Sequence, residues 1–196
     1  RDAYRQQDGA FDRFLDYLNN HYVTEPTPSD LHFQFPARIV QDMLAYFRDF
    51  YAQPKFARVS FPEPHSPYQV PEPYFSMFRA AIPERAAGVN ILPGKGFPWT
   101  WQHQLVNFRG ADNIADWRRY RANYLGMIRL IDDQIKVLLD GLTALDELYN
   151  RYLVFVSDQG DFAGDYGLPR KGVSLPRFWS GLGIEAVKMI TERWCH

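Results

Sequence analysis

An amphipathic stretch followed by a short apolar run constrains the fold of this chain more than any other feature. From Tyr124 to Leu142, apolar residues recur three or four positions apart, and charged residues occupy the positions between them. This spacing predicts a helix with one buried face. The continuous apolar run Tyr152–Val156 follows, as is typical of a buried, parallel strand. A helix that leads into a buried strand predicts an α/β layered fold, with ligands at the carboxyl ends of the strands.

The first half of the chain is less regular. Apolar spacing predicts one helix over residues 10–22 and a second over about 37–51, which Pro54 ends. The segment Phe56–Phe61 is rich in aromatic and β-branched residues and predicts a short strand. Residues 62–98 are rich in proline, glycine and aromatics, which predicts a long, ordered loop.

Composition limits the classes of function. The chain has 196 residues and a net charge of −1, so it lacks the basic surplus typical of proteins that bind nucleic acid or anionic membranes. No apolar run approaches the roughly 20 residues that span a bilayer. Cys195 is the only cysteine, which excludes an internal disulfide and a cysteine-based zinc cluster. The cellular compartment and the oligomeric state are not determined by the sequence.

The residues after the predicted strand could bind a metal. Asp158 and Gln159 supply a carboxylate and an amide carbonyl, which are hard oxygen ligands for Ca²⁺ or Mg²⁺. Two ligands do not complete a site, so others must come from elsewhere. The alternative is an ordinary polar turn, in which Asp and Gly are common, and the tetrapeptide 157–160 alone favours that alternative.

Two further residues could act on an anion. Lys171 follows a loop rich in Gly and Asp, and its ammonium group suits one oxygen of a tetrahedral anion, although most lysines are simply solvated. His65 lies between Pro64 and Pro67. These prolines stiffen the backbone, so the imidazole could donate to a leaving-group oxygen, or the histidine could be incidental. The pair Asp132-Asp133 lies on the polar face of the long helix, where solvation is the simpler interpretation.

Three segments, in this order, resemble the sulfatase family of the alkaline-phosphatase-like superfamily. They are Ser60–Tyr68 with its Pro-His-x-Pro element, the helical stretch Tyr124–Ile135, and Val156–Asp161 continued by Gly164–Leu168 and Lys171-Gly172. The resemblance is strongest over residues 56–184, where Ser180–Ile184 is similar to a strand and turn of the family. It implies a layered fold with a largely parallel central sheet flanked by helices, of which residues 1–196 form a part.

The resemblance also implies roles for single residues. Asp158 would be a metal ligand, and Gln159 would occupy the adjacent ligand position, where relatives more often carry Asn or His. The metal would be a divalent cation, Ca²⁺ or alternatively Mg²⁺. Lys171 and His65 would contact the sulfate and the leaving-group oxygen. Tyr166 stands where many relatives have His and receives no role.

One family feature is missing from the sequence. Sulfatases use a formylglycine nucleophile made from a Cys/Ser-x-Pro/Ala-x-Arg motif, and Cys195 is followed only by His196. The chain therefore resembles an internal-to-C-terminal portion of a sulfatase catalytic domain, with the formylglycine expected upstream. Residues 1–196 alone are predicted to be inactive. The implied substrate is a sulfate-ester small molecule or a sulfated glycan.

Two other functions fit these residues. A phosphonate monoester or phosphodiester hydrolase of the same superfamily would use the same metal and anion geometry. A non-catalytic module or pseudo-enzyme could instead bind glycans through aromatic residues such as Trp99 and Trp101.

Overall fold

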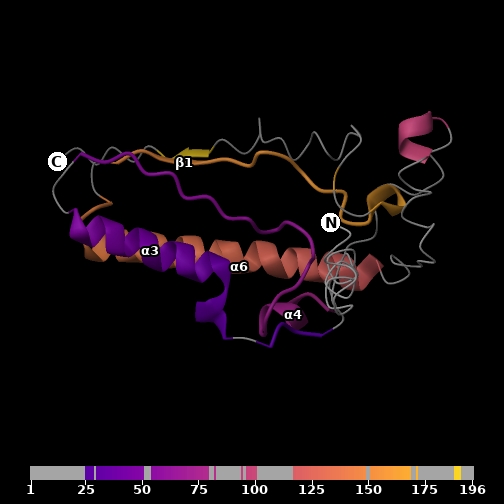
Figure 1. Cartoon of the computed structure of the whole chain (residues 1–196), viewed down its shortest axis with the longest axis horizontal. Helices are drawn as coiled ribbons and strands as arrows, with labels where there is room; N and C mark the ends of the chain where they lie inside the picture. Colours follow the sequence, from indigo (N-terminus) through magenta and orange to yellow (C-terminus); the bar gives the residue numbers. More distant parts are fainter. Residues whose placement is uncertain are drawn as a thin grey trace, which may run out of the picture.

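The long helix α6 (Trp117–Ala144) is the element on which helices α3 (Phe35–Asp49) and α4 (Tyr74–Met77) pack (Figure 1). The computed structural model describes residues 25–28, 30–50, 54–79, 82, 94, 96–100, 117–148, 151–168, 171 and 188–190. The buried apolar residues of α6 follow the helical spacing of the sequence, and they include Tyr120, Met127 and Leu130. The predicted amphipathic helix is therefore confirmed, and it extends at its N-terminus to Trp117.

Helix α6 ends in a hydrogen-bonded cap. Asp146 adopts the left-handed conformation with φ at 57°, which Asp tolerates better than most residues. The Glu147 amide donates to the Leu142 carbonyl at 2.8 Å, and the Asp146 amide donates to the Thr143 carbonyl at 3.0 Å. This pair of bonds is the Schellman pattern, which satisfies carbonyl groups that the helix leaves without partners.

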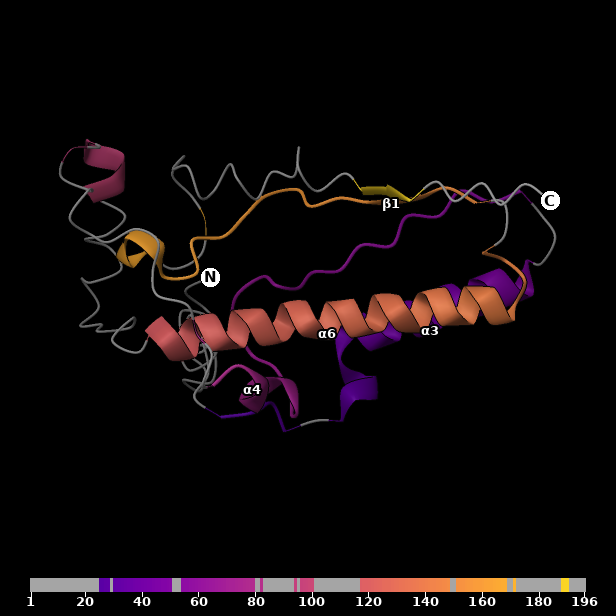
Figure 2. The same ribbon diagram turned by 180° about the vertical axis from the view of Figure 1, so that it is seen from behind.

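Helix α3 (Phe35–Asp49) lies alongside α6 in both views (Figures 1 and 2) and confirms the helix predicted over about 37–51. It begins with Pro36 in its first turn, where the missing amide hydrogen costs nothing. Val40 and Phe47 are buried at the contact. Gly141 of α6 permits a close approach, since a Cβ there would lie 2.6 Å from the end of the Leu44 side chain.

The short helix α4 (Tyr74–Met77) packs on the N-terminal half of α6. A Cβ on Gly126 would lie 2.6 Å from the Tyr74 carbonyl oxygen, so the two backbones meet only because residue 126 is glycine. The main hydrophobic core forms here, from residues of α4, α6 and the segments around them: Tyr68, Val70, Tyr74, Phe75, Tyr120, Met127, Leu130 and Ala163. Elsewhere in residues 62–79 the backbone is irregular, as predicted for this stretch.

Strand β1 (Leu153–Phe155) differs from the buried, parallel strand that was predicted. It pairs with β2 (Lys188–Ile190) in an antiparallel register that places Val154 opposite Met189. Val154 is 60% exposed and Phe155 52% exposed. The prediction is wrong because an apolar run indicates only that a strand is suited to burial. Burial also requires layers on both faces, and within the described residues β1 has a partner strand on one edge only.

The strand predicted over Phe56–Phe61 is not formed either. Residues 54–62 carry no assigned strand, and Phe56 is 94% exposed. Aromatic and β-branched residues fit a pleated surface, but a ladder also needs a neighbouring strand. The helix predicted over 10–22 and the strand and turn predicted at Ser180–Ile184 lie outside the described residues.

Candidate functional site

The turn after β1 carries the two predicted metal ligands. The Ser157 hydroxyl donates to the Gln159 carbonyl oxygen at 3.0 Å, which closes the turn. The Asp158 side chain is exposed, and that of Gln159 is half-buried. Both residues therefore have part of their surface in contact with solvent.

The loop that follows is fixed to the first turns of α6. Arg121 donates through Nη2 to Asp165 Oδ1 at 2.7 Å and through Nε to the Ala163 carbonyl at 3.1 Å. The side chains of Arg121 and Asp165 are only 11% and 7% exposed. Gly164 has a φ of 89° and lets the chain turn against Trp117, whose Cβ lies 3.4 Å from the position of an added methyl group. These contacts hold the residues after Asp158 in one conformation.

Tyr166, to which the sequence patterns assigned no role, is part of this packing. Its ring meets Phe162 edge-on with centroids 5.8 Å apart, and both side chains are buried. Its φ of 61° is unusual for a residue with a side chain. Here Tyr166 supports the loop from within.

His65 lies at the end of a tight turn. Its amide donates to the Pro62 carbonyl at 3.1 Å, and its Nδ1 lies 2.7 Å from the Ser66 carbonyl oxygen. Because a carbonyl oxygen can only accept, Nδ1 carries the hydrogen of this bond. The ring is exposed, and its Nε2 is the atom that can exchange a proton with a ligand.

Asp161 connects these segments, although the sequence patterns did not single it out. Its Oδ1 accepts a hydrogen bond from the Ala163 amide at 2.8 Å, and its Oδ2 accepts a short one from the Tyr68 hydroxyl. Burial raises the pKa of the Asp161 carboxyl, while these hydrogen bonds and the charges of Lys171 and His65 act in the opposite direction.

The same carboxyl therefore lies within electrostatic reach of both predicted anion-binding residues. Lys171 is half-buried. Asp161 follows Asp158 by three residues, so their Cα atoms are at most about 11 Å apart. The half-buried Asp161 thus feels the charge of both His65 and Lys171, and it follows the candidate metal ligands Asp158 and Gln159 by three and two residues.

Tyr68, another residue that the sequence patterns missed, anchors Asp161 to α6. It is fully buried, and its ring meets those of Tyr120 and Tyr124 edge-on at 4.5 and 5.5 Å. Its carbonyl accepts a hydrogen bond from Asn123 at 2.9 Å. The possible sequence signal was its position, three residues after His65 in the proline-rich segment.

The pair Asp132-Asp133 does not belong to this site. Asp132 is exposed, and Asp133 accepts hydrogen bonds from Tyr74 at 2.9 Å and from Arg129 at 2.7 Å. Asp133 therefore ties α4 to α6, as a structural residue. In the described part of the chain, no three His, Cys, Asp or Glu residues are grouped so that they could hold a metal ion. Asp158 and Gln159 can supply only part of a metal site.

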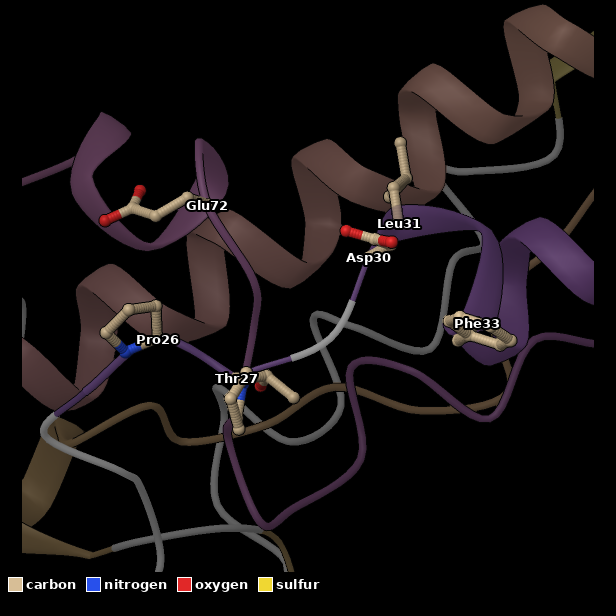
Figure 3. A pocket seen from close by; sticks show the side chains of 7 residues that line it. Pro26, Thr27, Asp30, Leu31, Phe33 and Glu72 are labelled. Atoms are coloured by element: carbon tan, nitrogen blue, oxygen red, sulfur yellow. The ribbon is translucent and has the colours of Figure 1, made fainter.

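The described residues also form an open pocket of about 600 Å³, away from these side chains. Figure 3 shows it between η1 (Leu31–Phe33) and the segment that leads into α4, with Asp30 and Glu72 on its walls. In both overall views this side of α6 faces away from β1 (Figures 1 and 2). None of the predicted site residues lines the pocket. None of the described helices is long and apolar enough to cross a bilayer.

Comparisons with known proteins agree with the resemblance. The chain is 34% identical over 131 residues to an arylsulfatase of Clostridium perfringens, covering 62% of this chain and 25% of that protein. It is 26% identical over 133 residues to human N-acetylglucosamine-6-sulfatase, covering 68% and 23% of the two chains. The chain thus spans about a quarter of the length of these relatives.

Solved structures agree on the fold. The phosphonate monoester hydrolase of Agrobacterium radiobacter superposes with a TM-score of 0.66 at 22% identity, covering 86% of this chain and 39% of that one. The family model described as Sulfatase matches residues 2–178. The chain belongs to the sulfatase family.

Proposed function

We propose that the complete protein hydrolyses sulfate esters, and that residues of this chain bind the sulfate group and supply some of the ligands of the metal. The observation that carries the proposal is that Tyr68, three residues after His65, donates a hydrogen bond to Asp161, which follows Asp158 by three residues. The charges of His65 and Lys171 both act to lower the pKa of that carboxyl. A sulfate ester carries negative charge on its outer oxygens and expels an alkoxide. A site for such an ester needs cationic groups that stabilise the charge on the outer oxygens and a proton donor for the departing alkoxide.

Each basic residue has a distinct role in this proposal. Lys171 contacts a sulfuryl oxygen as a compact positive charge. His65 donates a proton from Nε2 to the leaving-group oxygen, because its Nδ1 hydrogen is held by the Ser66 carbonyl. The 2.7 Å bond to Ser66 fixes the ring direction, so Nε2 points the same way before and after the substrate binds.

Asp158 and Gln159 fit a hard divalent cation, since both carry side-chain oxygens and lie at one turn, where Asp158 is exposed and Gln159 half-buried. We propose Ca²⁺, with Mg²⁺ as the alternative. Ca²⁺ takes about six to eight oxygen ligands, so most of its ligands come from other residues and water. When bound, the cation would supply positive charge beside the sulfuryl oxygens.

The proposed nucleophile is a formylglycine, which this chain does not provide, since its one cysteine lies outside the required motif. The proposed complete domain has a largely parallel central sheet flanked by helices. The superposition on a solved hydrolase of this superfamily supports the overall fold. The names of the related arylsulfatase and N-acetylglucosamine-6-sulfatase favour a sulfated small molecule or a sulfated sugar as the substrate.

The test uses the protein encoded by the complete gene and three substrates with one leaving group: para-nitrophenyl sulfate, para-nitrophenyl phosphate and para-nitrophenyl phenylphosphonate. We expect the highest kcat/KM for the sulfate. A preference for the phenylphosphonate would overturn the proposal in favour of a phosphonate hydrolase, which shares the fold. No turnover of any ester by the metal-loaded protein would instead favour a non-catalytic module.

Matched variants assign the roles. Lys171→Ala and His65→Ala should each lower kcat/KM by about a hundredfold, the scale for losing one charge-stabilising donor. Lys136→Ala and His32→Ala are the controls, since both residues are exposed and distant in sequence from the site. They should retain the activity of the unaltered protein.

A further inference from the structure

We propose that Arg121 is a positioning residue, whose guanidinium group holds the 161–168 loop in the backbone conformation that places Asp158 and Lys171 for one substrate. The inference rests on the proposed function, in which Asp158 helps to bind the metal and Lys171 contacts the sulfate. Arg121 lies on α6, away in sequence from both residues, and it acts on them through the loop that joins them.

The guanidinium group binds the loop at two points, one on each side of Gly164. Its Nε donates to the Ala163 carbonyl oxygen at 3.1 Å, and its Nη2 donates to Asp165 Oδ1 at 2.7 Å. Little of the Arg121 or Asp165 side chain reaches solvent. The planar fork of an arginine suits this two-point contact, whereas a lysine offers a single ammonium group on a flexible stem.

The backbone between and just after these contacts has an unfavourable conformation. The φ angles of Ala163, Gly164 and Tyr166 are 47°, 89° and 61°. A residue with a Cβ is disfavoured in the left-handed region, so Ala163 and Tyr166 keep these angles only because their surroundings impose them. Arg121 binds the carbonyl group of Ala163 itself and therefore helps to impose the conformation.

The rest of the loop forms one hydrogen-bonded unit. The Asp165 amide donates to the Phe162 carbonyl at 2.9 Å, and the Leu168 amide donates to the Asp165 carbonyl at 3.1 Å. Phe162 and Leu168 are fully buried. In both overall views the loop lies beside the first turns of α6 (Figures 1 and 2). Arg121 therefore attaches a compact unit to the helix.

The two proposed site residues lie just beyond the ends of this unit. Asp158 precedes Phe162 by four residues, and Lys171 follows Leu168 by three. At about 3.6 Å per residue, Asp158 and Lys171 lie at most about 14 and 11 Å from these buried residues. A fully extended chain between Asp158 and Lys171 could instead span more than about 40 Å. Fixing the loop thus limits the separation of the metal ligand and the sulfate-binding residue.

The test compares Arg121→Lys and Arg121→Ala in the complete protein. The matched control is Arg129→Ala, which removes an arginine of the same helix whose Nη2 lies 2.7 Å from Asp133 Oδ1, but within α6. One readout is the inhibition constant of inorganic sulfate against para-nitrophenyl sulfate. The other is the dissociation constant of Ca²⁺, measured by calorimetry on the metal-free protein.

Both constants should rise about tenfold in Arg121→Lys, because a shift of about 1 Å in a site group, or the loss of a group that orients a metal ligand, costs one to two orders of magnitude. The joint rise is expected because the loop carries one residue of each kind. Neither constant depends on the fraction of protein that is folded. Arg129→Ala should leave both constants unchanged.

A second substitution separates positioning from a general structural role. Glycine adopts the φ angle of Ala163 without strain, so Ala163→Gly should restore the loop conformation in the Arg121→Lys protein. Both constants of the double variant should fall by about threefold relative to Arg121→Lys, since more molecules have the competent loop. Ala163→Gly alone should change neither constant. If the double variant binds no better than Arg121→Lys, the inference is overturned.

Two further results would overturn the inference, and they differ in what else they overturn. If Lys171→Ala weakens sulfate binding while both Arg121 variants bind sulfate and Ca²⁺ normally, Arg121 has no positioning role and the proposed function stands. If Lys171→Ala also binds sulfate normally, the anion site lies elsewhere, and the proposed role of Lys171 falls with the inference. If Arg121→Ala does not fold, Arg121→Lys alone decides the question.

Discussion

Asp158 and Asp161 lie three residues apart and have opposite environments. Asp158 is exposed at the turn after β1, whereas Asp161 is half-buried and accepts hydrogen bonds from Ala163 and Tyr68. An exposed carboxylate can exchange water for a metal ion, while one whose two oxygens already accept protein hydrogen bonds has fewer free lone pairs. Residue type alone therefore does not separate a candidate metal ligand from an aspartate that is bound within the protein, and the local contacts do.

The contribution of Tyr74 to the stability of the folded protein should depend on pH. Burial, with the hydrogen bond to Asp133, raises its pKa from 10.0 to about 12. Because the folded state holds the proton more tightly than the unfolded state, its stabilising contribution is complete below about pH 10 and is lost as the pH rises toward 12. Denaturant unfolding at about pH 9 and about pH 11 should show a smaller loss of stability for Tyr74→Phe than for the unaltered protein. Equal losses would contradict the assignment, since Tyr68 and Tyr124 are present in both proteins.

At the scale of elements, α6 connects the candidate site to the core. Its first turns bind the 161–168 loop through Arg121, its middle meets α4 at Gly126, and its last turns meet α3 at Gly141. Helices α3 and α6 were predictable, because their apolar spacing is long and regular. The loop and the Asp161 contacts were not, because they depend on pairs such as Tyr68 and Asp161 that lie far apart in the sequence.

The two glycines of α6 should respond differently to alanine. Alanine gains about 1 kcal/mol of helix propensity at either position. At Gly126 the new methyl group would meet the Tyr74 backbone, which cannot move without displacing α4, so Gly126→Ala should cost about 1–3 kcal/mol. At Gly141 it meets only the flexible end of Leu44, so Gly141→Ala should cost less or stabilise. Thermal unfolding checks the order, and an equal or higher Tm for Gly126→Ala would contradict it.

The Arg121–Asp165 pair should stabilise the loop far more than an exposed pair on the same helix. Asp165→Asn leaves a buried guanidinium with a weakened partner and should cost about 3 kcal/mol. The control, Asp140→Asn, breaks the ion pair with Lys136, in which the Lys136 side chain is 73% exposed and the Asp140 side chain 64% exposed. Because this pair is exposed, the substitution should cost about 0.5 kcal/mol or less. Chemical denaturation compares the two variants. If Asp140→Asn proves as destabilising as Asp165→Asn, the loop is not held in this way.

At the scale of the whole molecule, the sequence did not predict the exposure of the apolar residues of β1 or its antiparallel pairing. The apolar run suits a buried sheet, yet a sheet forms only with neighbouring strands, and two short strands are marginal by themselves. The sulfatase relatives are about four times as long as the part this chain matches. Residues in this chain could therefore indicate the family and half of a site, but not the complete sheet or the nucleophile.

The central claim is that His65 and Lys171 act on one sulfate group, and a double-mutant cycle tests it most directly. The measurement is kcat/KM for para-nitrophenyl sulfate in the complete protein, its His65→Ala and Lys171→Ala variants, and the double variant. Residues that contact one bound group are energetically coupled. The fold loss of kcat/KM in the double variant should therefore be smaller than the product of the two single-variant losses by at least about tenfold, a coupling free energy of roughly 1.4 kcal/mol. Single losses that multiply without coupling, or single variants with full activity, would contradict the claim.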